Sequence, residues 1–216
     1  MTVSATPSPD PSVTTVVFDL GGVLIDWDPR YLYRQLLATD EAIEAFLDEV
    51  GFPGWNHAVD AGTTTWTDAV AALAAAHPHH RELIEAYPLR FAETLAGPIE
   101  DSVEVLRELH ELGLRLLALT NWSAETFPVA LERFDFLALF DDIVVSGAER
   151  VAKPDPEIFA LLVRRHGLDP SRTLFVDDKQ ANVDAAGRAG LVGVLFTDAV
   201  TLREDLESAG VLHRGS

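Results

Sequence analysis

Short apolar runs alternate with segments of helical spacing over most of the chain. Residues 13–18 are β-branched and apolar and stop at Asp19, which is typical of a buried strand that ends in a tight loop. Similar short strands are expected at 114–119, 143–145, 173–176 and 193–196. Helices are expected at 101–112, 123–134 (with a disturbance at Pro128), 156–166 and 181–189. Strands that alternate with helices predict an α/β fold with a doubly wound parallel sheet.

Between residues 29 and 96 the pattern indicates helices alone. Apolar residues at 43, 46, 47 and 50 fit one helix face, and the Gly51-Phe-Pro-Gly54 turn ends that helix. Further helices are expected over 65–76 and within 81–95, and no strand is expected in this stretch. We therefore predict an α/β core, 13–26 and 97–216, with an inserted helical cap domain, 27–96. Residues 1–12 are rich in Pro, Ser and Thr and are predicted to be a disordered tail.

Composition excludes several classes of protein. The 216 residues include 35 Asp and Glu against 16 Lys and Arg, a net charge of −19, which opposes binding to nucleic acid or to anionic lipid. No apolar run approaches the ~18 residues of a membrane span, and the first residues do not resemble a secretory signal. The absence of cysteine excludes disulfides and thiolate chemistry. These features predict a cytoplasmic protein.

Polar residues follow each expected strand. They are Asp19, Thr120 with Asn121, Ser146 with the later Lys153, and Asp177 with Asp178. Because ligands of open α/β sheets bind beyond the carboxyl ends of the strands, we expect these residues to converge on one edge. Each of them alone could cap a helix or close a turn, but the joint set favours a site.

This set suits phosphoryl transfer. An ionised aspartate can act as a nucleophile, but it repels a phosphate unless a cation lies between them. Magnesium prefers oxygen ligands, and the adjacent acids Asp177 and Asp178 offer such ligands. Thr120 and Lys153 offer a donor and a positive charge to the remaining phosphate oxygens.

Four motifs, in this order, resemble the haloacid dehalogenase-like hydrolase superfamily. They are Phe18-Asp-Leu-Gly-Gly-Val-Leu24, Leu119-Thr-Asn121, Lys153-Pro-Asp-Pro156, and Phe175-Val-Asp-Asp178 followed by Asn182. The resemblance covers the chain from about residue 13 to 197, and the helical insert is similar to the cap of this family. Among its members the chain most resembles bacterial sugar-phosphate phosphatases and the N-terminal phosphatase domain of soluble epoxide hydrolases.

The resemblance implies that Asp19 is the nucleophile and forms an aspartyl-phosphate. It also implies that Mg²⁺ is the cofactor, bound by the Asp19 carboxylate, the Gly21 backbone carbonyl and Asp178, with Asp177 supporting its water shell. The resemblance assigns the other roles as follows: Thr120 and the backbone of Asn121 hold the phosphoryl group, Lys153 neutralises its charge and orients Asp19, and Asn182 supports the metal site.

Gly21 departs from the pattern of many phosphatases of this superfamily, in which an aspartate at this position protonates the leaving oxygen. Glycine has no proton to give, and positioned acid catalysis contributes roughly 10²–10⁴-fold. Either the substrate has a good leaving group, or a cap residue supplies the acid, or the protein is weakly active. His57 is a candidate acid, and Trp55 is either a core residue or a platform for a sugar. Both are expected on a loop between cap helices.

We therefore expect a magnesium-dependent phosphatase for a small organic phosphomonoester, with sugar phosphates among the candidates. One alternative is a metal-independent 2-haloacid dehalogenase, since a leaving halide needs no proton, although the dehalogenases lack the Asp-Asp pair. The other is a non-catalytic or weakly active relative that only binds its ligand. Asp26 and Trp27, in a hairpin-like flap, are expected to border the site. The sequence does not indicate an oligomeric state.

Overall fold

The computed structural model of the chain describes residues 13–212 and contains a five-stranded parallel sheet. The strand order is β5-β4-β1-β6-β7, so the first strand lies at the centre. This arrangement confirms the predicted doubly wound α/β fold. The strands are β1 (Thr15–Phe18), β4 (Arg115–Thr120), β5 (Asp142–Val145), β6 (Thr173–Asp177) and β7 (Val192–Leu195).

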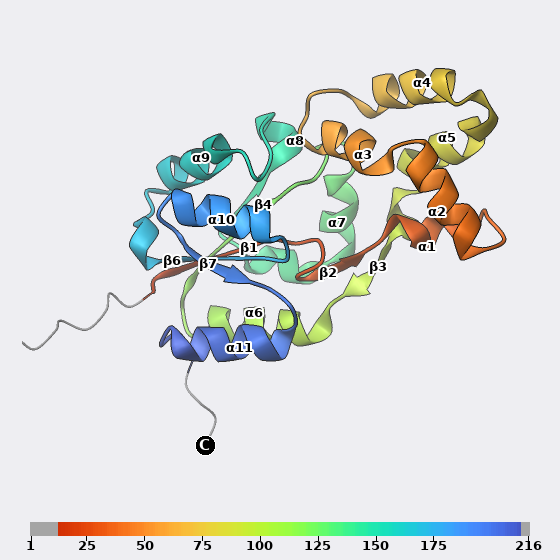
Figure 1. Ribbon diagram of the computed structural model, residues 1–216. Helices are drawn as coiled ribbons and strands as arrows, with labels where there is room; N and C mark the ends of the chain where they lie inside the picture. Colours follow the sequence, from red (N-terminus) through yellow and green to blue (C-terminus); the bar gives the residue numbers. More distant parts are fainter. Residues whose placement is uncertain (1–12, 213–216) are drawn as a thin grey trace, which may run out of the picture.

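Alternate residues of β1 face opposite sides of the sheet, as the strand period requires. Val16 and Phe18 belong to one hydrophobic cluster, which includes side chains of α6 (Glu100–Glu111) and α11 (Ala199–Ser208). Val17 belongs to the other cluster, with α9 (Pro156–His166) and α10 (Gln180–Arg188). Figure 1 shows these two helix pairs on opposite faces of the sheet.

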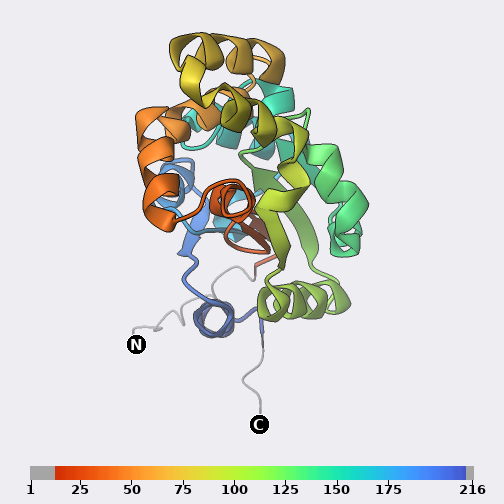
Figure 2. The same cartoon turned by 90° about the vertical axis from the view of Figure 1, so that its right-hand side faces the viewer.

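The register of the sheet aligns the strand ends. Phe18 pairs with Ala118 of β4 and with Val176 of β6, so the residues that follow these strands leave the sheet at the same edge. That edge faces a lobe of helices, which we call the helical lobe (Figures 1 and 2). The lobe consists of α1 (Pro29–Tyr33), α2 (Asp40–Glu49), α3 (Phe52–Asp60), α4 (Trp66–Ala76) and α5 (Arg81–Leu89).

Two short strands join the helical lobe to the sheet domain. β2 (Ile25–Trp27) and β3 (Leu95–Pro98) pair antiparallel, at the entrance to the lobe and at its exit. The flap at β2 agrees with the expected hairpin-like segment, but β3 was not expected, because its Leu-Ala-Gly-Pro sequence has no strand pattern. The connection between the two parts therefore consists of two paired strands.

Several boundaries differ from the predictions for physical reasons. Gly51 ends α2 in the left-handed conformation, as expected, but α3 begins at the very next residue, with Pro53 in its first turn. Pro128 likewise lies at the start of α7 (Phe127–Arg133) and does not disturb it, so that helix is shorter than predicted. The helix α11 was not predicted. The remaining elements are α8 (Ser146–Glu149) and the 3₁₀ turns Pro78–His80, Phe91–Thr94, Asp135–Leu139 and Pro170–Arg172.

The prediction for residues 1–12 lies outside the described residues. Within 13–212, none of the helices combines the length and the apolar character needed to cross a bilayer.

Candidate active site

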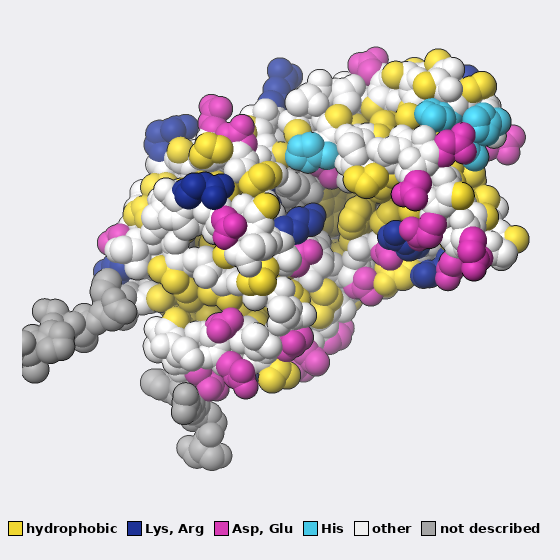
Figure 3. Space-filling view, in the orientation of Figure 1, with side chains coloured by type: hydrophobic (Ala, Val, Ile, Leu, Met, Phe, Trp, Pro, Cys, Tyr) yellow, Lys and Arg dark blue, Asp and Glu magenta, His cyan; other side chains and the backbone are white. Residues whose placement is uncertain are grey.

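A cavity of about 530 Å³ lies between the carboxyl edge of the sheet and the helical lobe. Figure 3 shows the hollow between the two parts of the molecule. Its sheet-side lining includes Asp19, Thr120, Asn121, Lys153 and Asp178, which the motifs predicted to converge. Residues separated by up to 159 positions in the sequence thus share one cavity.

Lys153 is the centre of this set. Its side chain is fully buried, and its Nζ lies 2.9 Å from Asp19 Oδ2 and 2.7 Å from Asp177 Oδ2. A buried ammonium group is tolerated only with such partners. Asn121 fixes the backbone of the lysine, because its side-chain Nδ2 donates to the Lys153 carbonyl and its Oδ1 accepts from the Lys153 N–H, both at 2.8 Å.

Asp177 is fixed by four hydrogen bonds or ion pairs. Besides Lys153, the side-chain Nδ2 of Asn182 donates to both carboxylate oxygens at 2.9 and 3.0 Å, and the backbone N–H of Lys179 donates to Oδ1 at 2.9 Å. Asp177 is fully buried, so these bonds replace its hydration. Its oxygens are therefore engaged by the protein itself.

Three carboxylates crowd the bottom of the cavity. Oxygens of Asp19, Asp177 and Asp178 all lie within 4.8 Å of one another. Burial raises the pKa of Asp19 to about 7, against the lowering effect of Lys153, and burial also raises the pKa of Asp178. Among the described residues, Lys153 is the only cationic group in ion-pair contact with the three, so their combined charge is not balanced.

The two glycines after Asp19 differ in their surroundings. Gly22 has a φ of +76°, and a Cβ on it would lie 2.9 Å from Asp178 Oδ2, so only glycine lets this loop approach the carboxylate. A Cβ on Gly21 would meet nothing within 4 Å, although Gly21 also lines the cavity. The Gly21 position therefore has room for a side chain.

The helical lobe contributes α3 to the cavity. His57 and Asp60 line it from this helix, which corrects the expectation of a loop at these positions. Burial raises the pKa of Asp60 to about 7. Asp60 Oδ1 accepts from the backbone N–H of Ser123 at 3.0 Å, so this carboxylate links the lobe to the loop after β4. No sequence motif predicted this link.

Some expected site residues lie elsewhere. Trp55 does not line the cavity, since its ring packs against Phe52 and Trp66 and its Nε1 donates to the Ala69 carbonyl at 3.1 Å. Trp55 therefore packs as a core residue of the helical lobe, which is one of the two roles expected for it, and not beside the cavity.

Ser146 and Asp26 also make structural hydrogen bonds and do not line the cavity. Ser146 Oγ accepts from the Trp122 N–H at 2.9 Å and donates to the Asp60 carbonyl, and it does not line the cavity. Asp26 accepts from the Tyr31 hydroxyl at 2.8 Å and is likewise absent from the lining, whereas the neighbouring Trp27 does line it.

Comparison with known proteins gives a consistent result. The family model for haloacid dehalogenase-like hydrolases matches residues 13–190. The chain is 28% identical to the sesquiterpene phosphatase astK of Aspergillus oryzae, over 85% of this chain and 90% of that protein. It is also 28% identical to the pyrophosphatase PpaX of Bacillus velezensis, over 87% of this chain and 86% of that protein.

Solved structures share the fold. A HAD family enzyme from Bacteroides thetaiotaomicron superposes with a TM-score of 0.69 at 20% identity, over 87% of this chain and 95% of that chain. An L-2-haloacid dehalogenase from Xanthobacter autotrophicus superposes with a TM-score of 0.62 at 21% identity, over 93% and 84%. At this identity the likeness supports the fold alone.

Proposed function

Because the chain belongs to the haloacid dehalogenase-like hydrolase family, we propose that it is a magnesium-dependent phosphatase that hydrolyses a small organic phosphomonoester through a phosphorylated Asp19. The observation that carries the proposal is the group of three carboxylates around a single buried lysine at the bottom of the cavity. The phosphatases among its relatives act, by their names, on chemically different phosphates. They support the reaction without fixing the substrate.

The carboxylate group fits a divalent cation. The three carboxylates have one ammonium group beside them, in contact with Asp19 and Asp177, so their negative charge is not balanced, and oxygen ligands are those that Mg²⁺ prefers. Asp19, Asp178 and the Gly21 carbonyl would hold the ion, and when bound it supplies neutralising charge between the nucleophile and the phosphate. Asp177 positions Lys153, since its own oxygens are already engaged.

Each residue of the site then has its own role in the reaction. Lys153 contacts Asp19 and opposes the rise in the Asp19 pKa that burial causes, so it favours the ionised form of the nucleophile. The Thr120 hydroxyl and the Asn121 backbone N–H hold the phosphoryl oxygens beside it. The Asp19 oxygen forms a bond to phosphorus as the bond to the alcohol oxygen breaks, and water later releases phosphate from Asp19.

The leaving alcohol needs a proton that Gly21 does not supply. His57 lines the cavity from α3, and its imidazole makes no hydrogen bond to the described residues. We assign it the role of proton donor, because its imidazole lines the cavity and an imidazole nitrogen can carry and donate a proton. The expected effect of His57→Ala is a decrease in kcat that is larger for alkyl than for aryl phosphates, whose leaving groups need less help.

Hydrolysis of an aryl phosphate tests the proposal. We expect turnover that EDTA abolishes and added Mg²⁺ restores, and we expect Asp19→Asn to remove it. Asp141→Asn is the matched control, since Asp141 is an exposed carboxylate that does not line the cavity. Activity that survives both EDTA and Asp19→Asn would contradict the proposal.

The dehalogenase alternative accounts for Gly21 but leaves Asp178 without a role, because Asp178 has no ion-pair partner among the described residues and would have no metal to bind. Release of halide from a short 2-haloacid without metal would select it. Binding of Mg²⁺ and phosphate without turnover of any phosphomonoester would select the non-catalytic alternative. The same substrate panel, with sugar phosphates included, tests the sequence prediction of a sugar phosphate.

A further inference from the structure

Aromatic rings form a continuous wall of the cavity. Phe52 and Tyr87 have ring centroids 5.0 Å apart, Tyr87 and Phe91 5.9 Å, and Phe91 and Trp122 5.7 Å. All four residues line the cavity, and we call them the aromatic wall. Trp122 directly follows Asn121 at the phosphate end, whereas Phe52 belongs to the helical lobe. The wall therefore runs from the reacting phosphate into the lobe.

Other apolar groups extend this surface. Trp27 from the flap, Leu47 from α2, and Pro29 and Pro53 at the starts of two helices also line the cavity. Figure 3 shows hydrophobic side chains gathered in the hollow between the two parts of the molecule. With a volume of about 530 Å³, the cavity has room for an organic group considerably larger than the phosphate itself.

Several polar groups of the lobe that face the cavity already have partners. The Arg30 guanidinium donates to both Glu44 oxygens and to Asp28. Asn56 donates to Asp60 at 2.6 Å. A site that selects a polyhydroxylated sugar needs free donors and acceptors for its hydroxyl groups. Within the described residues, the lobe side of the cavity offers the side chains of His57 and Asp48, Asn56 Oδ1 and the Tyr87 hydroxyl without a hydrogen-bond partner.

Charge on the lobe side of the cavity opposes an anionic organic group. Glu44, Asp48 and Asp60 face the cavity together with a single arginine, Arg30. A carboxylate on the organic part of the substrate would be repelled there, because like charges in a partly desolvated cleft are not well screened. The cationic groups, Lys153 and Lys179, lie at the phosphate end.

We infer that the alcohol part of the substrate is uncharged and largely apolar, an aromatic or bulky hydrocarbon group that lies along the aromatic wall. The inference rests on the proposed phosphatase function and names its substrate class. Hydrolysis consumes one water and releases inorganic phosphate and the apolar alcohol. The aromatic wall determines specificity, and the carboxylates and Lys153 perform the chemistry.

A substrate series tests this with the wild-type protein. We expect kcat/KM with Mg²⁺ to rise about threefold to fourfold for each methylene from ethyl to hexyl phosphate, since each buried CH₂ contributes about 0.8 kcal/mol. Phenylalkyl phosphates should exceed glucose phosphates and phosphoglycolate. If the two polar substrates are hydrolysed as well as the apolar ones, the inference is wrong while the phosphatase proposal stands. If none of these phosphates is hydrolysed, the phosphatase proposal itself fails.

A variant pair locates the effect. Phe91→Leu removes one ring of the wall, and we expect the preference for 3-phenylpropyl phosphate over ethyl phosphate to fall about threefold to tenfold. Phe136→Leu is the matched control, since Phe136 is buried to a similar degree but does not line the cavity. An unchanged preference in Phe91→Leu, or an equal fall in both variants, would overturn the role of the wall. If Phe91→Leu does not fold, the wild-type series alone decides.

Discussion

The absence of a proton donor at position 21 is a property of one residue, and it can be reversed. A Cβ at Gly21 meets nothing within 4 Å, and the position lines the cavity next to Asp19. We expect Gly21→Asp, made in the His57→Ala variant, to raise kcat/KM for alkyl phosphates on the order of 10²-fold, because it supplies at position 21 the acid that His57 no longer provides. Steady-state kinetics with an alkyl and an aryl phosphate would measure this, with a smaller gain for the aryl ester.

The adjacent glycine provides the control for Gly21→Asp. Gly22 has a positive φ, and its Cβ would lie 2.9 Å from Asp178. Gly22→Asp should therefore remove activity and destabilise the loop. If Gly21→Asp in the His57→Ala variant leaves the ratio of alkyl to aryl turnover unchanged, the leaving oxygen receives its proton from a group other than His57.

Asp60 makes the stability of the protein depend on pH. Burial raises its pKa to about 7, whereas an unfolded aspartate has a pKa of ~3.9. Between these values the folded protein holds a proton that the unfolded chain has lost, so the contribution of Asp60 to stability falls as pH rises from about 4 to 7. We expect Asp60→Asn to flatten the decline of Tm with pH in this window.

The replacement is conservative at that site. The carbonyl of an introduced amide can still accept from the Ser123 N–H, and rotation of the Asn56 amide would present its buried, unpaired Oδ1 to the new NH₂. Parallel Tm profiles for the wild type and Asp60→Asn between pH 4 and 7 would show that Asp60 titrates normally.

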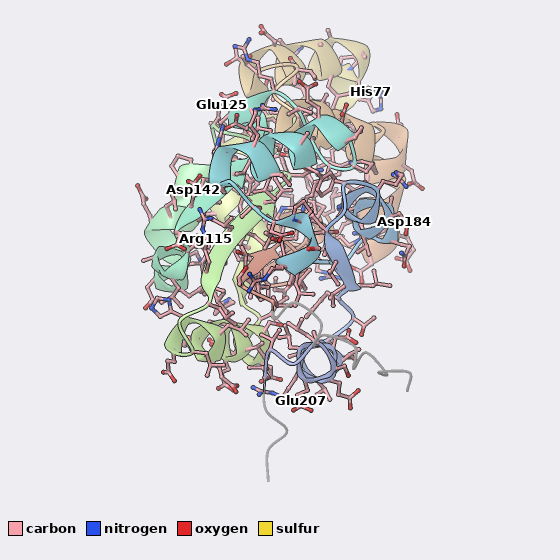
Figure 4. The ribbon with its side chains drawn as sticks, turned by 90° about the vertical axis from the view of Figure 1, so that its left-hand side faces the viewer. His77, Arg115, Glu125, Asp142, Asp184 and Glu207 are labelled. Atoms are coloured by element: carbon pink, nitrogen blue, oxygen red, sulfur yellow. The ribbon has the colours of Figure 1, made fainter. Side chains whose placement is uncertain are left out.

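At the scale of elements, the end of α3 joins the helical lobe to the sheet domain. A Cβ on Gly62, which has a φ of +65°, would lie 2.5 Å from the Gly147 carbonyl oxygen. Close by, the carboxylate of Glu125, labelled in Figure 4, accepts from the Trp66 N–H at 2.9 Å. At Gly62 the backbone of the lobe therefore lies directly against the backbone of the sheet domain, with no room for a side chain.

Gly62→Ala should lower the free energy of unfolding by about 2 kcal/mol or more. The alanine would be strained in the left-handed conformation, and its Cβ would also clash with the Gly147 carbonyl oxygen. Gly54→Ala is the matched control: Gly54 lies within α3 with nothing near its Cβ, and alanine there should stabilise by about 0.5–1 kcal/mol. Urea denaturation of both variants measures the difference. A Gly62→Ala variant as stable as the wild type would mean that the contact yields easily.

The elements of the core could be predicted because their patterns are local. The helix at 156–166 begins with proline and ends before Gly167, and the structure has it at the same residues. In contrast, β3 consists of Leu-Ala-Gly-Pro, and it is a strand only because β2 lies beside it. The start of α3 directly after Gly51 was missed because the Gly51-Phe-Pro-Gly54 sequence favours a turn.

The same distinction applies to the candidate site. Asp19 and Asp178 follow strands and Thr120 ends one, so the topology of a parallel sheet was enough to place them together. The aromatic wall comes from positions 52, 87, 91 and 122, and no local pattern connects these residues. Trp55 is aromatic like the residues of the wall and follows Phe52 by three positions, yet its side chain packs in the core of the lobe. Only the packing of the helices determines which of these aromatic side chains faces the cavity and which faces the core.

At the scale of the whole molecule, the net charge of −19 means that a bound cation should stabilise the folded protein as well as serve catalysis. The fold holds oxygens of Asp19, Asp177 and Asp178 within 4.8 Å of one another, with Lys153 as the only ion-pair partner among the described residues. Repulsion within this group costs folding free energy, and an ion that binds only the folded state recovers it.

We therefore expect Mg²⁺ to raise the Tm of the metal-free protein. At about 100 times the dissociation constant, binding contributes about 2.7 kcal/mol, which for a chain of this size corresponds to about 5–10 °C.

Asp178→Asn removes a ligand of the ion and part of the repulsion. This variant should therefore melt no lower than the metal-free wild type, and Mg²⁺ should not raise its Tm. Asp141→Asn should respond to Mg²⁺ like the wild type. Differential scanning fluorimetry measures both effects without any substrate. An equal Mg²⁺ shift in Asp178→Asn would place the cation elsewhere on this acidic surface, and no shift in the wild type would favour the metal-independent dehalogenase, because only the phosphatase needs a cation between two anions.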